Sequence, residues 1–151
     1  MSQPNSGTSA RCELTSAFLL LRLFLALRAL MSCIEKFESG GVYSFQNYYV
    51  NMTRMATGIT GASFLPLWAT KSFALPLGYI LGVLGLMLLL GLKTRLALIL
   101  SGLLYVALAF GLMAVQQSDG VAWLGVYVGL TVAALVLVRH NRFAIWPDQH
   151  D

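Results

Sequence analysis

Four charged residues in and directly after the first apolar segment are the groups in this chain best placed for chemistry. Arg22 lies near the middle of the segment, Arg28 follows six residues later, and Glu35 and Lys36 lie at its end. Arginine stays protonated in proteins, and a charge at the centre of a bilayer costs about 2.5–3.5 kcal/mol on insertion scales. Each arginine must therefore face the interior of a helix bundle or reach water, lipid phosphate or an acid.

The acids available to these arginines are few. Glu35 follows Arg28 by seven residues, two helical turns along the same face, so their side chains can meet only by leaning together. The chain's other acids are Glu13, Glu38, Asp119, Asp148 and Asp151. None lies in a later apolar segment, so Arg22 has no acidic partner there. Its remaining candidate partners are backbone carbonyls, Ser16, Ser101, Tyr105, an anionic ligand and another subunit.

Two interpretations of these charges stay open. One is a site that binds a quinone oxygen, a small anion or a partner's carboxylate. The other is a structural role, in which the side chains extend to the membrane surface or hold the helices of the bundle together. Both concern the same residues, Arg22, Arg28, Glu35 and Lys36. Tyr48 and Tyr49 belong to an aromatic run near Glu35, which either lines a quinone-sized slot or forms an interfacial belt. No cofactor motif or metal-ligand spacing accompanies them, so a catalytic role is undecided and a metal site is not expected.

The composition indicates that lipid surrounds the elements carrying these residues. Of 151 residues, 58% are hydrophobic and only 11% are charged, against about a quarter charged in soluble domains. The apolar segments are residues 14–34, 73–92, 96–115 and 121–138. Each is long enough to cross a hydrocarbon core of about 30 Å, and none shows the alternation of a barrel strand. The sequence predicts an all-α membrane protein, a four-transmembrane-helix bundle.

Basic residues predict the orientation of the bundle. Lys93 and Arg95 lie in the tight second linker and Arg139 follows the fourth segment, so the positive-inside rule places both termini in the cytoplasm. Residues 1–13 are then a disordered cytoplasmic tail, residues 35–72 an outer loop and residues 139–151 a second cytoplasmic tail. The net charge of +4 is scattered singly, which argues against nucleic acid as a partner.

The outer loop and the small residues complete the expected architecture. Apolar residues recur every three or four positions over residues 45–59, which predicts a short amphipathic helix at the outer surface. Small residues at helical spacing allow helices to pack closely in lipid. The glycines expected to form such contacts are Gly78, Gly82 and Gly85 on the second span and Gly125 and Gly129 on the fourth.

Several motifs make the chain resemble the DoxX family of small membrane proteins. The resemblance covers roughly residues 20–112. It is carried by Leu20-Leu21-Arg22-Leu23, Ile34-Glu35-Lys36-Phe37, Phe64-Leu65-Pro66 and Leu90-Gly91-Leu92-Lys93-Thr94-Arg95-Leu96. The chain departs from the family at Arg28, where an apolar residue is commoner, and at Ser32-Cys33, where a His-Gly pair often occurs.

The resemblance implies a four-helix bundle linked to redox membranes, because the family includes the large subunit of thiosulfate:quinone oxidoreductase. Arg22, Glu35, Lys36 and Arg95 lie on matching positions. The leading hypothesis is an accessory subunit of a quinone-linked redox complex in a bacterial inner membrane, with the lipid bilayer and other membrane or redox subunits as partners. The alternatives are a membrane subunit of a thiosulfate- or sulfur-compound:quinone oxidoreductase and a small solute transporter.

Overall fold

Helices account for nearly all of the chain that the structure describes, which comprises residues 6–141 and residue 145 of a computed structural model. In chain order the elements are α1 (Ser6–Glu35), β1 (Glu38–Ser39), β2 (Val42–Tyr43), α2 (Phe45–Ala62), α3 (Leu67–Leu90), α4 (Thr94–Ala114), α5 (Ser118–Leu137) and the 3₁₀ helix η1 (Val138–His140). Helices α1, α3, α4 and α5 are each long and apolar enough to cross a bilayer. The predicted all-α fold with four spanning helices is confirmed, and the chain is an integral membrane protein.

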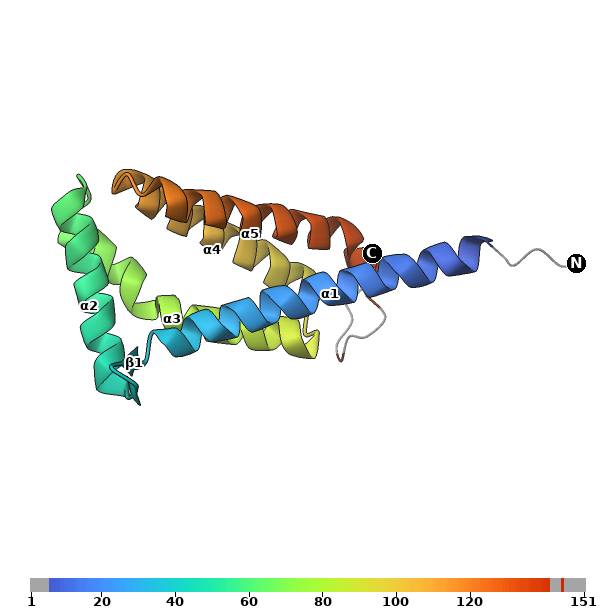
Figure 1. Ribbon diagram of the computed structural model, residues 1–151, viewed down its shortest axis with the longest axis horizontal. Coiled ribbons are helices and arrows are strands. Elements are labelled where there is room, and N and C mark those ends of the chain that lie inside the picture. Colours follow the sequence, from blue (N-terminus) through green and yellow to red (C-terminus); the bar gives the residue numbers. More distant parts are fainter. Residues whose placement is uncertain (1–5, 142–144, 146–151) are drawn as a thin grey trace, which may run out of the picture.

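Helix α1 is longer than the sequence predicts. It begins at Ser6, inside the segment 1–13 predicted to be disordered, and its 30 residues extend about 45 Å. Once a helix is nucleated, each added residue costs little, so the small polar residues before the apolar span continue it. The first turns of α1 project past the other helices (Figure 1). Residues 1–5, 142–144 and 146–151, which belong to the two predicted tails, lie outside the described residues.

A tight hairpin connects α1 to α2. Strands β1 and β2 pair antiparallel, and the turn between them has positive φ at Gly40 (61°) and Gly41 (80°), as a two-residue type I′ turn requires. Ser44 then caps α2 by accepting a hydrogen bond from the amide of Asn47. Helix α2 matches the predicted amphipathic helix and lies across one end of the bundle (Figure 1). Its buried residues are Tyr48, Met52 and Ala56.

The four spanning helices pack as two pairs, α1 with α3 and α4 with α5. Glycines bring α3 close to α1: a Cβ atom built at Gly85 would lie 2.8 Å from Cγ of Leu30, and one at Gly82 would lie 3.0 Å from Sγ of Cys33. The prediction for Gly125 and Gly129 needs correction. Both are exposed on α5, and a Cβ atom at either would meet no heavy atom of the described chain within 4 Å.

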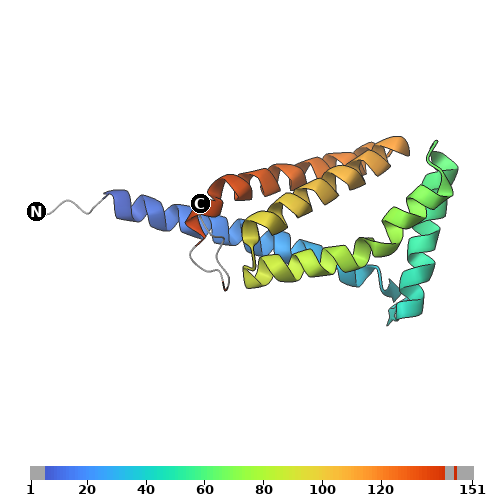
Figure 2. The same cartoon turned by 180° about the vertical axis from the view of Figure 1, so that it is seen from behind.

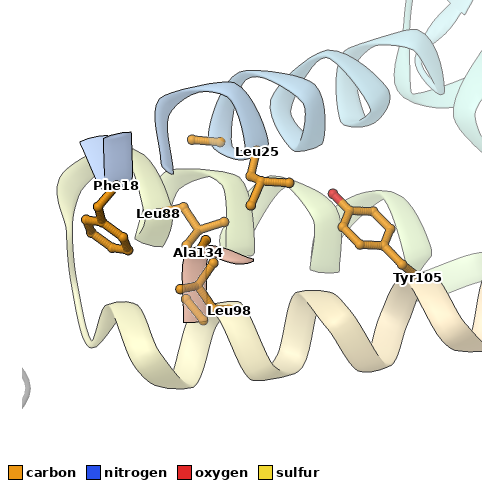
Figure 3. Close-up of a cluster of buried hydrophobic side chains, with 8 residues drawn as sticks. Phe18, Leu25, Leu88, Leu98, Tyr105 and Ala134 are labelled. Atoms are coloured by element: carbon orange, nitrogen blue, oxygen red, sulfur yellow. The ribbon is translucent and has the colours of Figure 1, made fainter. Parts of the chain in front are cut away.

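The two pairs converge at one end of the bundle and diverge at the other (Figures 1 and 2). We call the end with the α3–α4 turn, residues 91–93, the hairpin end, and the opposite end the α2 end. A buried apolar cluster joins the pairs near the hairpin end, where side chains from α1, α3, α4 and α5 meet between the helices (Figure 3). Its members include Phe18, Leu25, Leu88, Leu98 and Ala134. Towards the α2 end this core gives way to open space.

Candidate functional site: a cavity between the helix pairs

A cavity of about 550 Å³ occupies the space between the two helix pairs on the α2 side of the core. Residues from all five α-helices line it. It exists because close packing within each pair, as at Gly85 and Leu30, is not matched by equally close packing between the pairs. Helix α2 lies across the same end and contributes Met55 and Ile59 to the wall.

Three polar residues meet at the deep end of the cavity, each from a different spanning helix. Arg28 of α1 donates a hydrogen bond from Nε to the hydroxyl of Tyr127 on α5, over 3.0 Å. The guanidinium carbon also lies 5.4 Å from the centre of the Tyr127 ring, a cation–π distance. Tyr105 of α4 has its ring centre 5.7 Å from that of Tyr127, and its side chain reaches into the space between the pairs (Figure 3).

A charged pair lies between the deep end and the mouth of the cavity. Nη1 of Arg28 is 3.7 Å from Oε1 of Glu35, so the two side chains lean together along α1, which is the one way in which their spacing allows them to meet. Ser32 lies between them on the same face, and Lys36 borders the cavity next to Glu35. Arg28, Glu35 and Lys36, three of the four predicted charged site residues, are therefore brought together at one cavity.

The remaining walls are almost wholly apolar. They consist mainly of Phe73, Leu77 and Leu81 of α3, Leu108, Phe110 and Leu112 of α4, and Trp123 and Leu124 of α5. An apolar chamber with a few convergent polar groups is the usual form of a small-molecule site, and such sites span about 300–1,000 Å³. The cavity therefore suits an amphiphile with an oxygen-bearing head group.

Arg22 is not part of this site. Its side chain is only 4% exposed, and Nη1 donates a hydrogen bond to Oδ1 of Asn141 over 2.9 Å. The amide nitrogen of Asn141 in turn donates to the hydroxyl of Thr94 over 2.9 Å. Asn141 follows η1 and Thr94 begins α4, so Arg22 lies level with the hairpin end rather than at mid-bundle. The long N-terminal extension of α1 explains the shift, because it makes the centre of the helix coincide with the end of the bundle.

Tyr48 and Tyr49 do not line the cavity either. The hydroxyl of Tyr48 donates to the carbonyl of Leu75 and accepts from the amide of Gly78, which fixes α2 on α3. Its ring stacks on Phe37, with ring centres 4.7 Å apart. Burial raises the pKa of the Tyr48 hydroxyl, and hydrogen bonding by the Gly78 amide opposes that rise. Tyr49 is 53% exposed beside this cluster. Tyr48 therefore packs α2 against α3, whereas Tyr49 lies at the surface of the α2 end.

Sequence reasoning missed Tyr127 and gave Tyr105 a different role. Tyr105 was a candidate partner for Arg22, yet it faces the Arg28 cavity. The available signal was that both tyrosines interrupt otherwise apolar spans, where a phenol group usually has a polar partner. Together Arg28, Ser32, Tyr105 and Tyr127 offer one permanent cation and three hydroxyl groups. This set can bind an electron-rich oxygen, and the described residues contain no cluster of three metal-ligating side chains.

Comparison of the chain with protein-family models, with curated proteins and with solved structures yields no match in any of the three. The resemblance to the DoxX family therefore stays a prediction, and the site has to be interpreted from its own geometry.

Proposed function

We propose that this integral membrane protein binds a quinone in the cavity between its helix pairs and serves as a membrane subunit of a quinone-linked redox assembly. The observation that carries the proposal is the division of the cavity into a polar deep end, with Arg28, Tyr105 and Tyr127, and apolar walls. A quinone has the same division, because its carbonyl oxygens accept hydrogen bonds while its ring and isoprenoid tail require apolar surroundings.

The assembly part of the proposal rests on the resemblance to the DoxX family. We propose that electrons reach or leave the bound quinone through a partner subunit, while this chain supplies the binding site and the membrane anchor. A sulfur-compound:quinone oxidoreductase is one assembly of this kind. No feature of the described chain favours solute transport over quinone binding.

The intrinsic fluorescence of Trp123 tests quinone binding directly, because this residue lines the cavity. In a Trp68→Phe/Trp146→Phe background, a short-tailed ubiquinone should quench Trp123 with a saturable curve. Arg28→Gln and Tyr127→Phe should each weaken binding about tenfold, since a hydrogen bond to a charged group contributes about 1.5–3 kcal/mol. Arg54→Gln, which removes an exposed charge from α2, should leave the curve unchanged. Linear, unsaturable quenching that is equal in all variants would reject the site.

Purification from the native host in mild detergent tests the assembly. We expect copurification with flavin, haem or iron–sulfur subunits, identified by mass spectrometry, and quinone in an organic extract of the same sample. Thiosulfate-dependent quinone reduction by that sample would narrow the assembly to a sulfur-compound oxidoreductase. A protein that purifies alone and without quinone would contradict the proposal and make transport the next function to assay.

A further inference from the structure

Arg28 is held in place inside the cavity rather than free to swing towards the membrane surface. Its Nε donates to the Tyr127 hydroxyl over 3.0 Å, and its guanidinium carbon lies 5.4 Å from the centre of the same ring. These two contacts fix the guanidinium against α5. A head group that reaches the deep end of the cavity therefore meets a cation of defined position.

Glu35 balances the charge of Arg28 without a close hydrogen bond. The distance of 3.7 Å between Arg28 Nη1 and Glu35 Oε1 lies within ion-pair range but beyond the 3.2 Å typical of an N–H···O hydrogen bond. Arginine has five N–H donors, and within the described chain the contact to Tyr127 takes the one on Nε. The Nη donors therefore stay available to an acceptor in the cavity.

This arrangement treats charged and uncharged head groups differently. A neutral carbonyl oxygen can accept from the Nη groups, whereas an anion there would lie close to the Glu35 carboxylate and be repelled by it. Lys36 also borders the cavity, but it lies after the end of α1, and in the described chain no ion pair joins it to Glu35. We infer that Glu35 is a specificity-determining residue, which makes the cavity select an uncharged, oxygen-bearing amphiphile over an anionic one. The inference deepens the proposed quinone-binding function and rests on it.

Two probes that both quench Trp123 test the inference in the single-tryptophan protein. One is the short-tailed ubiquinone, and the other is a brominated long-chain fatty acid at a pH where it is ionised. The wild type should prefer the quinone. Glu35→Gln should tighten fatty-acid binding about tenfold, equivalent to about 1.4 kcal/mol, and should change quinone binding less than about twofold. Glu35→Asp keeps the charge and should keep the wild-type preference.

Two further variants tie the effect to the head-group position. Glu13→Gln removes the same charge from α1 far from the cavity, and it should change neither affinity. Adding Arg28→Gln to Glu35→Gln should abolish the gain in fatty-acid affinity, because the gain depends on an unbalanced guanidinium.

The possible results separate the inference from the function beneath it. A Glu35→Gln protein that gains affinity for both probes equally, or for neither, would overturn the role of Glu35 even if quinone binding persists. Absence of quinone binding in the wild type would reject the proposed function. A selective gain in fatty-acid affinity in Glu35→Gln would in that case show that Glu35 repels anions, but selection between the two head groups would be rejected together with the function.

Discussion

The closed and the open region of the bundle hold an arginine of the same helix in opposite ways. Arg22, at the hairpin end, is buried and hydrogen-bonded to the neutral side chain of Asn141, which continues to Thr94. Arg28, less than two turns along α1, has 36% of its side chain exposed and faces a cavity with a tyrosine and a carboxylate. Depth along the helix does not explain this difference. It follows from whether the helix pairs converge, which buries an arginine in a polar network, or diverge, which leaves it open to a ligand.

The largest expected difference is in stability. Arg22→Ala should lower the free energy of unfolding by about 2–3 kcal/mol, because hydrogen bonds to a charged group contribute about 1.5–3 kcal/mol. Arg28→Ala should cost less, about 1–1.5 kcal/mol, because its hydrogen bond to Tyr127 and its ion pair with Glu35 are made by a partly exposed side chain. Denaturant unfolding in detergent micelles, followed by circular dichroism, measures both. Equal losses of stability in the two variants would show that the two arginines are held equally firmly.

Close packing provides the next test. Gly85→Val should lower the free energy of unfolding by about 1–3 kcal/mol, since its Cβ would lie 2.8 Å from Cγ of Leu30 and 3.1 Å from the Leu30 amide nitrogen. Gly125→Val, the matched change on the outward face of α5, should alter it by less than about 0.5 kcal/mol. A larger loss for Gly125→Val would mean that this face packs against something other than lipid.

Access by a thiol reagent distinguishes the open region from the closed one. In a Cys12→Ser/Cys33→Ala background, Ser32→Cys at the cavity should react with a small methanethiosulfonate at least about ten times faster than Ser101→Cys, because reactivity follows exposure. Ser101 is 3% exposed and lies nearer the hairpin end. Similar rates at the two positions would contradict a cavity confined to the α2 side.

The smallest effect is expected at the aromatic cluster. Tyr48→Phe removes a hydroxyl that bonds the Leu75 carbonyl and the Gly78 amide, so it should cost about 1 kcal/mol, whereas Tyr49→Phe should cost a few tenths. Burial raises the pKa of Tyr48 in the folded protein, which therefore holds the proton more tightly than the unfolded chain. Stability should fall as the pH rises above the ordinary tyrosine value of about 10, and Tyr48→Phe should lessen that fall. An unchanged pH profile would argue against a buried Tyr48.

Local patterns were sufficient to predict much of the fold. Runs of apolar residues located all four spanning helices, and periodicity located α2, because backbone hydrogen bonding in lipid leaves few alternatives to a helix. The seven-residue spacing placed Arg28 and Glu35 on one face of α1, where the structure brings the two side chains within 3.7 Å.

Features that depend on how the helices are arranged could not be predicted in this way. Asn141 is 119 residues from Arg22, and its asparagine side chain carries no charge to mark it as a partner. The spacing of Gly125 and Gly129 resembles that of Gly78 and Gly82, yet only the α3 glycines face another helix of the described chain. Periodicity identifies a candidate face but not its neighbour. The cavity could not be predicted from the sequence either, because it results from the divergence of the two helix pairs.

The hydrogen bond between Arg22 and Asn141 also has a consequence for biosynthesis. At about 5–20 residues per second, a ribosome needs roughly 6–24 seconds to add the 119 residues that separate them. Helix α1 must therefore enter the bilayer well before the side chain of Asn141 is synthesised, and this hydrogen bond at the hairpin end can form only after residue 141 has been added. Nascent chains arrested before Asn141 should lack this hydrogen bond, so Arg22 should be held less firmly at the hairpin end than in the longer chain.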